Sequence, residues 1–351
     1  MTLPTVWFVV VAFLWTGFFV LEGFDFGVGM LHKVVGRTDL EQRVAINTVG
    51  PFWDGNEVWL VVGAAGVFAA FPGWYATWFS ALYLVVVLLL VALMARGVSF
   101  EFRGRVDAAR WRHTWSWCLA VGSAVIPLLL GTALGNLLAG LPVGQDEEFT
   151  GTVADTVTGY GLLVGVTLLA LCVLHGATFL VLRTDGEVRL RAHRVATVTL
   201  WPAALLLVAF AVWTPSLSDA PAVRSVVPSA LAVVAVLVAA LLLRAHRDGW
   251  AFGATAAAVG LTVGSVFAAL YPSVLVSSTD PAYTLTVTGT ASGEYALQVM
   301  TVVAAFLVPV VLLYQGWSYV VFRRRVTGPP VPARPDPVPG PSTPLDEGAL
   351  T

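Results

Sequence analysis

The sequence predicts an all-α polytopic membrane protein. Its 351 residues are 58% hydrophobic and 11% charged, with a mean hydropathy of +0.83, whereas soluble domains carry about 25% charged residues. Apolar runs of roughly 20 residues, the length that crosses a bilayer core, recur along the chain. The basic residues fall in alternate loops between these runs. These observations exclude a soluble enzyme, and no nucleic-acid partner is expected.

Nine apolar runs are long enough to be transmembrane helices, at 5–28, 51–71, 76–95, 115–139, 157–182, 195–213, 225–243, 250–272 and 297–322. The first run has no basic leader and no small-residue cleavage site, so we expect it to be retained as a span. The second and third runs are separated by residues 71–75, whose Pro-Gly pair typically breaks helices and predicts a tight turn.

The Lys and Arg residues orient these spans, because cytoplasmic loops carry an excess of them. Eighteen of the 19 would lie on one side of a nine-span arrangement: Lys33, Arg37, Arg43, Arg96, Arg103, Arg105, Arg110, Arg112, Arg183, Arg189, Arg191, Arg194, Arg244, Arg247, Arg323, Arg324, Arg325 and Arg334. The opposite side would have Arg224 alone, among acidic loops. The distribution predicts an N-terminus outside and a C-terminus in the cytoplasm.

The chain is expected to form one transmembrane domain over residues 1–325, followed by a tail. Residues 326–351 are rich in proline without apolar periodicity, which predicts a disordered cytoplasmic tail. The two cysteines, Cys118 and Cys172, lie in apolar runs and are expected to be small buried side chains.

Four carboxylates are the main candidates for function. Glu22 and Asp25 lie toward the inner end of the first span, and Asp54 and Glu57 lie in the first turns of the second. The i, i+3 spacing places each pair on one helix face, and the antiparallel spans bring both pairs to the same depth. Ionisable groups at membrane depth are costly and mark functional sites. We therefore expect a hydrated polar entry that relays protons.

Neighbouring residues would support this site. The glycines allow close helix approach or unwound backbone, and the amide and indoles add hydrogen-bonding groups; these residues are Gly23, Gly27, Gly29, Gly55, Asn56, Trp53 and Trp59. Structural alternatives remain open for the acids themselves. Asp54 can interact favourably with the helix dipole in the first turn, and Asp25 can pair with Lys33 or Arg37 at the interface.

Haem or metal ligands are not expected in this chain. His32, His113, His193 and His246 fall in loops or at span ends, and His175 alone lies well inside a span. Axial haem ligands are typically His or Met, but Met94 and Met300 show no clear pairing with His175. We expect His175 to be a packed or hydrogen-bonded residue.

Two further polar groups lie at inner span ends. Arg96, Glu101, Arg103 and Arg105 after the third span are interpreted as a solvated face or, alternatively, a docking edge for a partner. Residues 314–319, Tyr-Gln-Gly-Trp-Ser-Tyr, are interpreted mainly as part of an interfacial aromatic belt.

The motifs around the acids resemble subunit II of cytochrome bd quinol oxidases, with the actinobacterial branch nearest. The segments that carry this resemblance are Gly23–Gly29 (GFDFGVG), Asn47, Gly50–Leu60 (GPFWDGNEVWL), Phe68–Pro72, Tyr271-Pro272, and Tyr314-Gln315, Trp317, Tyr319, Phe322 and Arg323. The resemblance covers nearly the whole chain up to Arg325.

The resemblance implies a haem-free subunit, not catalytic alone, in a heterodimer of the bacterial plasma membrane. Subunit I would carry two b-type haems, haem d and the quinol site, with menaquinol as the expected donor. The chain would stabilise that partner and supply a cytoplasmic proton path for reduction of O2 to water. By resemblance Asp54 and Asp25 occupy proton-path positions, whereas many relatives carry Gln at the position of Glu57. A structural quinone and small single-span accessory subunits are further possibilities.

Two other functions fit buried acids. A proton-coupled secondary transporter would also use them, although the odd span number and the lack of a detectable repeat disfavour it. A purely structural scaffold within the oxidase would use the acids for assembly alone.

Overall fold

The computed structural model describes residues 2–327, and the predicted tail, 326–351, lies almost entirely outside them. The described chain is all-α apart from a small two-stranded sheet. Its elements are α1 (Leu3–Val35), α2 (Asp39–Asn47), α3 (Trp53–Ala70), α4 (Pro72–Ala81), α5 (Tyr83–Phe102), α6 (Ala109–Ala139), η1 (Val153–Thr156), α7 (Gly159–Arg183), α8 (Gly186–Trp213), η2 (Thr214–Leu217), α9 (Ala222–Ser225), α10 (Val227–Arg244), α11 (Asp248–Leu270), β1 (Ser273–Leu275), η3 (Pro281–Tyr283), β2 (Leu285–Thr286) and α12 (Glu294–Val321).

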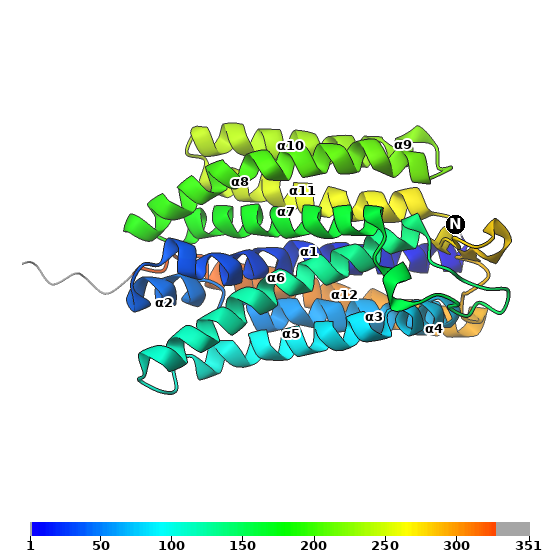
Figure 1. Cartoon of the computed structure of the whole chain (residues 1–351), viewed down its shortest axis with the longest axis horizontal. Helices are drawn as coiled ribbons and strands as arrows, with labels where there is room; N and C mark the ends of the chain where they lie inside the picture. The colour runs from blue at the N-terminus through cyan, green and yellow to red at the C-terminus, as the bar shows by residue number, and fades with distance from the viewer. Residues whose placement is uncertain (1, 328–351) are drawn as a thin grey trace, which may run out of the picture.

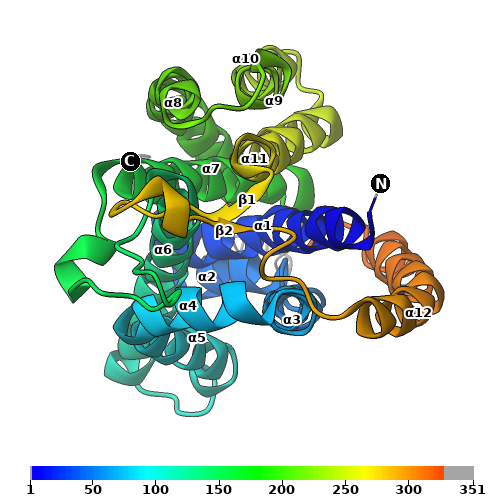
Figure 2. The same cartoon turned by 90° about the vertical axis from the view of Figure 1, so that its right-hand side faces the viewer.

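The long helices run side by side along the molecule (Figure 1). Seen end-on, α1 lies near the centre, with α7 and α11 on one side and α3 to α5 on the other (Figure 2). The loops after α1, α5, α7 and α10 gather at one end, which we call the basic end because most of the Arg residues lie there. The sheet of antiparallel β1 and β2 lies at the opposite end.

Within residues 2–327, eight helices are long and apolar enough to cross a membrane. The 18-residue α3 is not among them, since Asp54, Asn56 and Glu57 in its first two turns lower its hydropathy. It nevertheless runs alongside the other long helices (Figure 1). The structure therefore supports a multi-span helical protein, while the ninth span stays a prediction.

The segment between the second and third predicted spans differs from expectation. Phe71 alone separates α3 from α4, and Pro72 begins α4 at its first position, where the missing N–H of proline costs no helical hydrogen bond. Residues 73–75, expected in a turn, are helical. The predicted span 76–95 is divided instead at Leu82, whose ψ of 16° ends α4.

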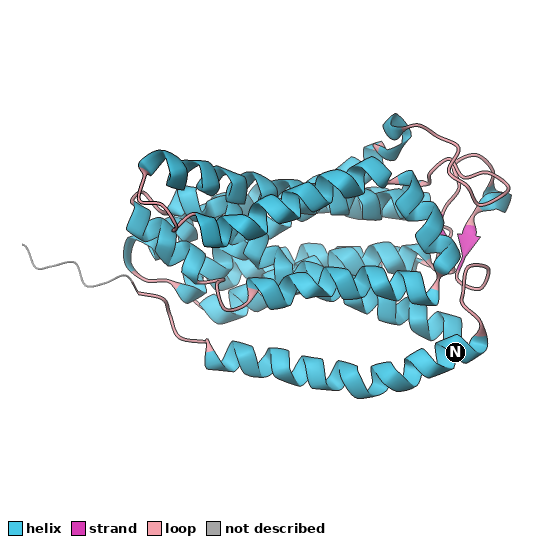
Figure 3. Ribbon diagram, turned by 90° about the horizontal axis from the view of Figure 1, so that it is seen from below, coloured by secondary structure: helices cyan, strands magenta, loops and turns pink. Residues whose placement is uncertain are grey.

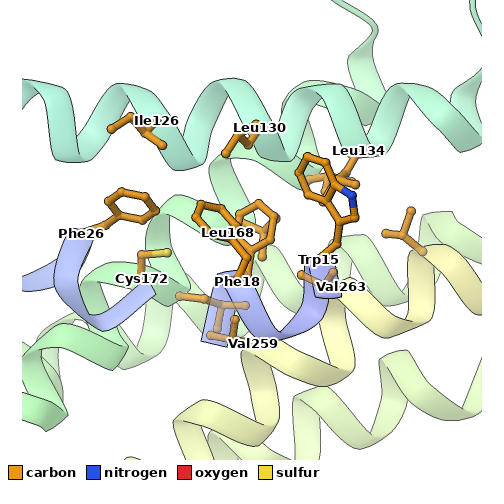
Figure 4. Close-up of a cluster of buried hydrophobic side chains, with 14 of the residues drawn as sticks. Trp15, Phe18, Phe26, Ile126, Leu130, Leu134, Leu168, Cys172, Val259 and Val263 are labelled. Carbon is orange, nitrogen blue, oxygen red and sulfur yellow. The ribbon is translucent and has the colours of Figure 1, made fainter. Parts of the chain in front are cut away.

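The core is built around α1. Trp15, Phe18 and Phe26 of α1 pack against apolar side chains from α6, α7 and α11, as Figure 4 shows. The α1 and α7 backbones touch where Gly27 meets Gly176, since a Cβ on Gly27 would lie 2.6 Å from the Gly176 Cα. Such close crossings need small residues.

The short helix α2 is fixed at the basic end. Its N-terminus has a capping box, in which Thr38 accepts from the Glu41 backbone and the Glu41 carboxylate accepts from the Thr38 backbone. The Glu41 carboxylate also pairs with Arg191 of α8 at 2.6 Å. Hydrogen bonds from Arg191 are the main cause that lowers the pKa of Glu41 from 4.5 to about 2.

In contrast, α12 packs loosely on the rest. Of its 28 residues, all described, Leu297 alone is buried, and the helix runs along the edge of the bundle (Figure 3). Polar contacts attach it: the Trp7 indole donates to Thr301 at 3.0 Å near one end, and the Val326 amide donates to the Arg183 carbonyl at 2.8 Å beyond the other.

Candidate functional site

Two of the four predicted acids are completely buried in α1. Glu22 and Asp25 have no exposed surface, and they lie one helical turn apart, as their spacing predicted. Oε2 of Glu22 and Oδ1 of Asp25 accept no hydrogen bond from any other described residue, whereas Oε1 of Glu22 forms an ion pair with Arg96. Buried carboxylate oxygens without donors are costly, so this part of α1 is not explained by packing alone.

Arg96 of α5 provides the counter-charge. Its guanidinium lies 2.5 Å from Glu22 and 3.3 Å from Glu57 of α3, and its side chain is fully buried. The guanidinium also stands over the Phe26 ring, 4.9 Å from its centroid, a favourable cation–π distance. One arginine therefore joins α1, α3 and α5.

The expectation of a solvated face around Arg96 was wrong for two of its four residues. The α5 helix continues to Phe102, beyond the predicted end at residue 95, and so Arg96 lies within the helix and faces α1. Arg103 is also buried, and it donates to Asp39 at 2.6 Å and to Ser116 at 2.8 Å. The remaining two residues, Glu101 and Arg105, are exposed. The sequence did contain a signal that Arg96 belongs to the site: this arginine directly follows an apolar run, at the depth predicted for the acids.

Asn56 connects Asp25 to α12. Its Nδ2 donates to Asp25 Oδ2 at 2.7 Å and to the Leu21 carbonyl at 3.0 Å. Its Oδ1 accepts from Gln315 Nε2 at 2.7 Å and from the Tyr319 hydroxyl at 3.2 Å. The interpretation of residues 314–319 as a mere aromatic belt therefore missed Gln315 and Tyr319, which belong to the site.

Asp54 lies apart from this cluster. It is exposed in the first turn of α3 and forms no ion pair or side-chain hydrogen bond with another described residue. The structure thus brings three of the four predicted acids together. Asp54 lies at the surface of the chain, although it is only three residues before Glu57.

Most of the predicted supporting residues lie in close contacts with other helices, whereas Gly55 does not. Trp53 stacks on Phe100 with ring centroids 4.7 Å apart, and Trp59 is buried against Phe13, with centroids 5.9 Å apart. A Cβ at Gly29 would overlap Ser123, and one at Gly23 would touch Cys172 at 3.4 Å, whereas one at Gly55 would meet nothing within 4 Å. Gly55 was therefore wrongly expected to allow a close helix approach.

His175 is packed and hydrogen-bonded, as predicted. Its Nδ1 lies 2.7 Å from the Thr255 hydroxyl, its Nε2 lies 3.2 Å from the Val20 carbonyl oxygen, and its ring stacks on Phe252. Within residues 2–327, no group of three or more His, Cys, Asp or Glu side chains is arranged to hold a metal ion.

A largely apolar cavity of about 490 Å³ adjoins the acids. It lies among α1, α3, α4, α5 and α6, and its walls include Trp15, Phe68, Trp78 and Leu89, with Glu57 as the acidic residue among the lining side chains. The carboxylate cluster therefore borders an apolar space on one side and α12 on the other.

The comparisons with known proteins agree with one another. The family model described as cytochrome bd terminal oxidase subunit II matches residues 3–322. The chain is 46% identical over 329 residues to the cytochrome bd ubiquinol oxidase subunit 2 of Bacillus subtilis, which covers 93% of this chain and 97% of that one. It is 37% identical over 364 residues to the cytochrome bd-I ubiquinol oxidase subunit 2 of Escherichia coli K12, covering 92% and 94%. A chain in the structure of the bd oxidase from Geobacillus thermodenitrificans shares the fold, with a TM-score of 0.73, 18% identity and coverage of 92% and 98%.

Proposed function

The chain belongs to the cytochrome bd terminal oxidase subunit II family, and from that premise we propose that it is the haem-free subunit that stabilises a haem-bearing subunit I and supplies its protons. As a family member it is a subunit of an oxidoreductase complex and a multi-pass protein of the bacterial inner membrane. Family membership leaves no support for the transporter alternative.

The proposed topology has nine spans, with the N-terminus outside and the basic end in the cytoplasm. The charge bias of the loops supports this orientation. The α3 helix counts as the ninth span because its 18 residues extend about 27 Å at 1.5 Å per residue, close to the thickness of the hydrocarbon core.

The observation that carries the proton-path proposal is the buried cluster of Glu22, Asp25, Glu57 and Arg96. Two carboxylates contact one guanidinium and the third, Asp25, lies one helical turn from Glu22, so full ionisation of all three would leave excess negative charge where charge is expensive. Sharing protons among the carboxylates relieves this excess. A group of acids that exchanges protons at little cost is what a relay requires.

Asp54 is the proposed entry to this relay. It is exposed at the start of α3, one helical turn before the half-buried Glu57. Arg96 pairs with both Glu57 and Glu22 and so holds the two carboxyl groups near each other; protons would pass between carboxyl groups, because the guanidinium keeps its own protons. A proton taken up at Asp54 would thus reach the buried acids over a short path toward the redox centre.

The haems and the quinol site are proposed to belong to subunit I, with two b-type haems and haem d there and menaquinol as the donor. A structural quinone in this chain would find apolar walls in the cavity beside Glu57. Small single-span accessory subunits would complete the complex.

The test is Asp54→Asn in the purified complex. We expect slower quinol-driven oxygen consumption with haem absorption nearly unchanged, because the neutral amide keeps the shape of the side chain but cannot release a proton. Loss of haem would assign the acid to assembly, in favour of the structural-scaffold alternative, and unchanged turnover would remove Asp54 from the path.

A further inference from the structure

A second, smaller hollow lies away from the acids, between α8 and α10. This groove has a volume of about 230 Å³ and mostly apolar walls, which include Trp201, Leu237, Ala240 and Leu241. His193 and Arg244 line it as well, toward the basic end of both helices. The two helices form one outer edge of the bundle (Figure 2). The groove faces the surroundings of the protein, since Trp201 and Leu241 in its walls are exposed.

Positive charge at the groove has no counter-charge among residues 2–327. Arg244 lines the groove, and Arg247 lies three residues further along the chain. Both are exposed, and neither side chain forms an ion pair or a hydrogen bond with any other residue in the described range. The nearest acid in sequence, Asp248, is bound instead to Arg189 at 2.7 Å and to Arg325 at 3.4 Å.

Histidine and tryptophan side chains lie in the groove wall and in the segment that follows Arg244. The His246 ring lies 5.8 Å from the ring of His193, and His193 is held by the Leu243 carbonyl at 3.3 Å. Trp250, in the first turn of α11, is 72% exposed, as is typical of residues at the level of lipid headgroups, and Trp201, two turns deeper in α8 than His193, is 64% exposed.

We propose that this groove binds an anionic phospholipid of the surrounding bilayer. The phosphate would lie against Arg244 and Arg247, and an acyl chain would lie along Trp201, Leu237 and Ala240. Basic pockets between transmembrane helices bind anionic headgroups in this way, and the apolar wall favours a lipid over a free anion. The proposal does not depend on the proton path or on which membrane side the basic end faces.

The experiment measures lipid retention by the purified oxidase complex. The complex is placed in nanodiscs of phosphatidylcholine with increasing dioleoylphosphatidylglycerol, and the lipid that stays bound after release is counted by native mass spectrometry. We expect the native complex to retain phosphatidylglycerol over phosphatidylcholine. The double variant Arg244→Gln/Arg247→Gln should bind it roughly 30-fold more weakly, since each basic residue contributes about 1 kcal/mol.

Two further variants make the result specific. Arg105→Gln removes an exposed arginine from the same end of the bundle, away from the groove, and should retain lipid as the native complex does. Ala240→Phe fills the groove without changing charge and should lose the retained lipid. The proposal is overturned if the double variant binds like the native complex, if Ala240→Phe has no effect, or if inorganic phosphate alone displaces the lipid.

Discussion

At the residue scale, Arg96 places a positive charge between two carboxylates, 2.5 Å from Glu22 and 3.3 Å from Glu57. Removing one partner of a buried ion pair leaves the other charge uncompensated, which costs about 3–5 kcal/mol. We therefore expect Arg96→Gln to lower the thermal stability and yield of the complex strongly, as measured by thermal unfolding in detergent.

The matched control for this prediction is Arg105→Gln, which removes an exposed arginine from the end of the same helix hairpin. It should change stability little, because exposed charges contribute little. The double variant Glu22→Gln/Arg96→Gln should regain part of the loss, since neither side chain is then a buried unpaired charge. An Arg96→Gln complex as stable as the native one would contradict the ion-pair account.

Glu41 gives a pH-dependent prediction outside the membrane. Hydrogen bonds from Arg191 lower its pKa from 4.5 to about 2, so the folded state favours the charged form. The stabilisation is complete above about pH 4.5 and disappears as the pH falls toward 2. The difference in Tm between the native complex and Glu41→Gln should be largest near pH 7 and shrink between pH 4.5 and 2.

The control for this titration is Glu101→Gln. Glu101 is exposed and forms no ion pair with another described residue, and its replacement should change the Tm at pH 7 little, because exposed charges contribute little. A Glu41→Gln difference that is constant with pH would show that the contact with Arg191 does not depend on the charge of Glu41.

At the scale of elements, the crossing of α1 and α7 depends on glycine. A Cβ at Gly27 would meet the Gly176 backbone at 2.6 Å, whereas a Cβ at Gly253 of α11 would meet nothing within 4 Å. Gly27→Ala should separate the helices and cost about 1–3 kcal/mol. Gly253→Ala should be neutral or stabilise by about 0.5–1 kcal/mol. Equal Tm values for the two variants would exclude a close crossing.

Which helices exist could be predicted from the sequence, because apolar run length is a strong signal for a span. Each predicted span from 115 onward coincides with one observed long helix except for at most two residues, and most of these helices extend beyond the predicted limits toward the basic end. The division at Leu82 was not predictable, since no Pro or Gly marks it. The loose position of α12 also escaped prediction, since an apolar helix that faces its neighbours and one that faces lipid have similar compositions.

The functional site could be predicted only in part, because several of its contacts join helices that are far apart in the sequence. Glu22, Asp25 and Glu57 stood out as charges in apolar helices, and the helical repeat placed them on shared faces. Arg96, which pairs with Glu22 and Glu57, comes from a helix further along the chain. So do Gln315 and Tyr319, which donate to Asn56. Sequence spacing gives no information about such contacts, because they depend on how helices pack in space.

At the scale of the whole molecule, the proposed orientation predicts which loops can be reached from each side. In a variant whose Cys118 and Cys172 are replaced by Ala, Gln145→Cys and Arg105→Cys place single thiols in exposed loops at opposite ends of the bundle. A membrane-impermeant maleimide added to intact cells should label Gln145→Cys and not Arg105→Cys. The reverse pattern would invert the topology.

A Lys introduced within residues 140–156 should leave oxidase activity unchanged, since proton entry is proposed at the other end.

The most direct measurement of the central claim is proton uptake by the complex that carries Asp25→Asn. Asp25 is fully buried and bound to Asn56, and the amide keeps its shape without its acidity. During a single turnover with oxygen, followed with a pH-indicator dye, we expect haem absorption like that of the native complex and proton uptake slowed roughly 100-fold, the scale of a lost proton-transfer group. Proton uptake at the native rate with intact haems would contradict the claim that these buried acids supply protons to the partner.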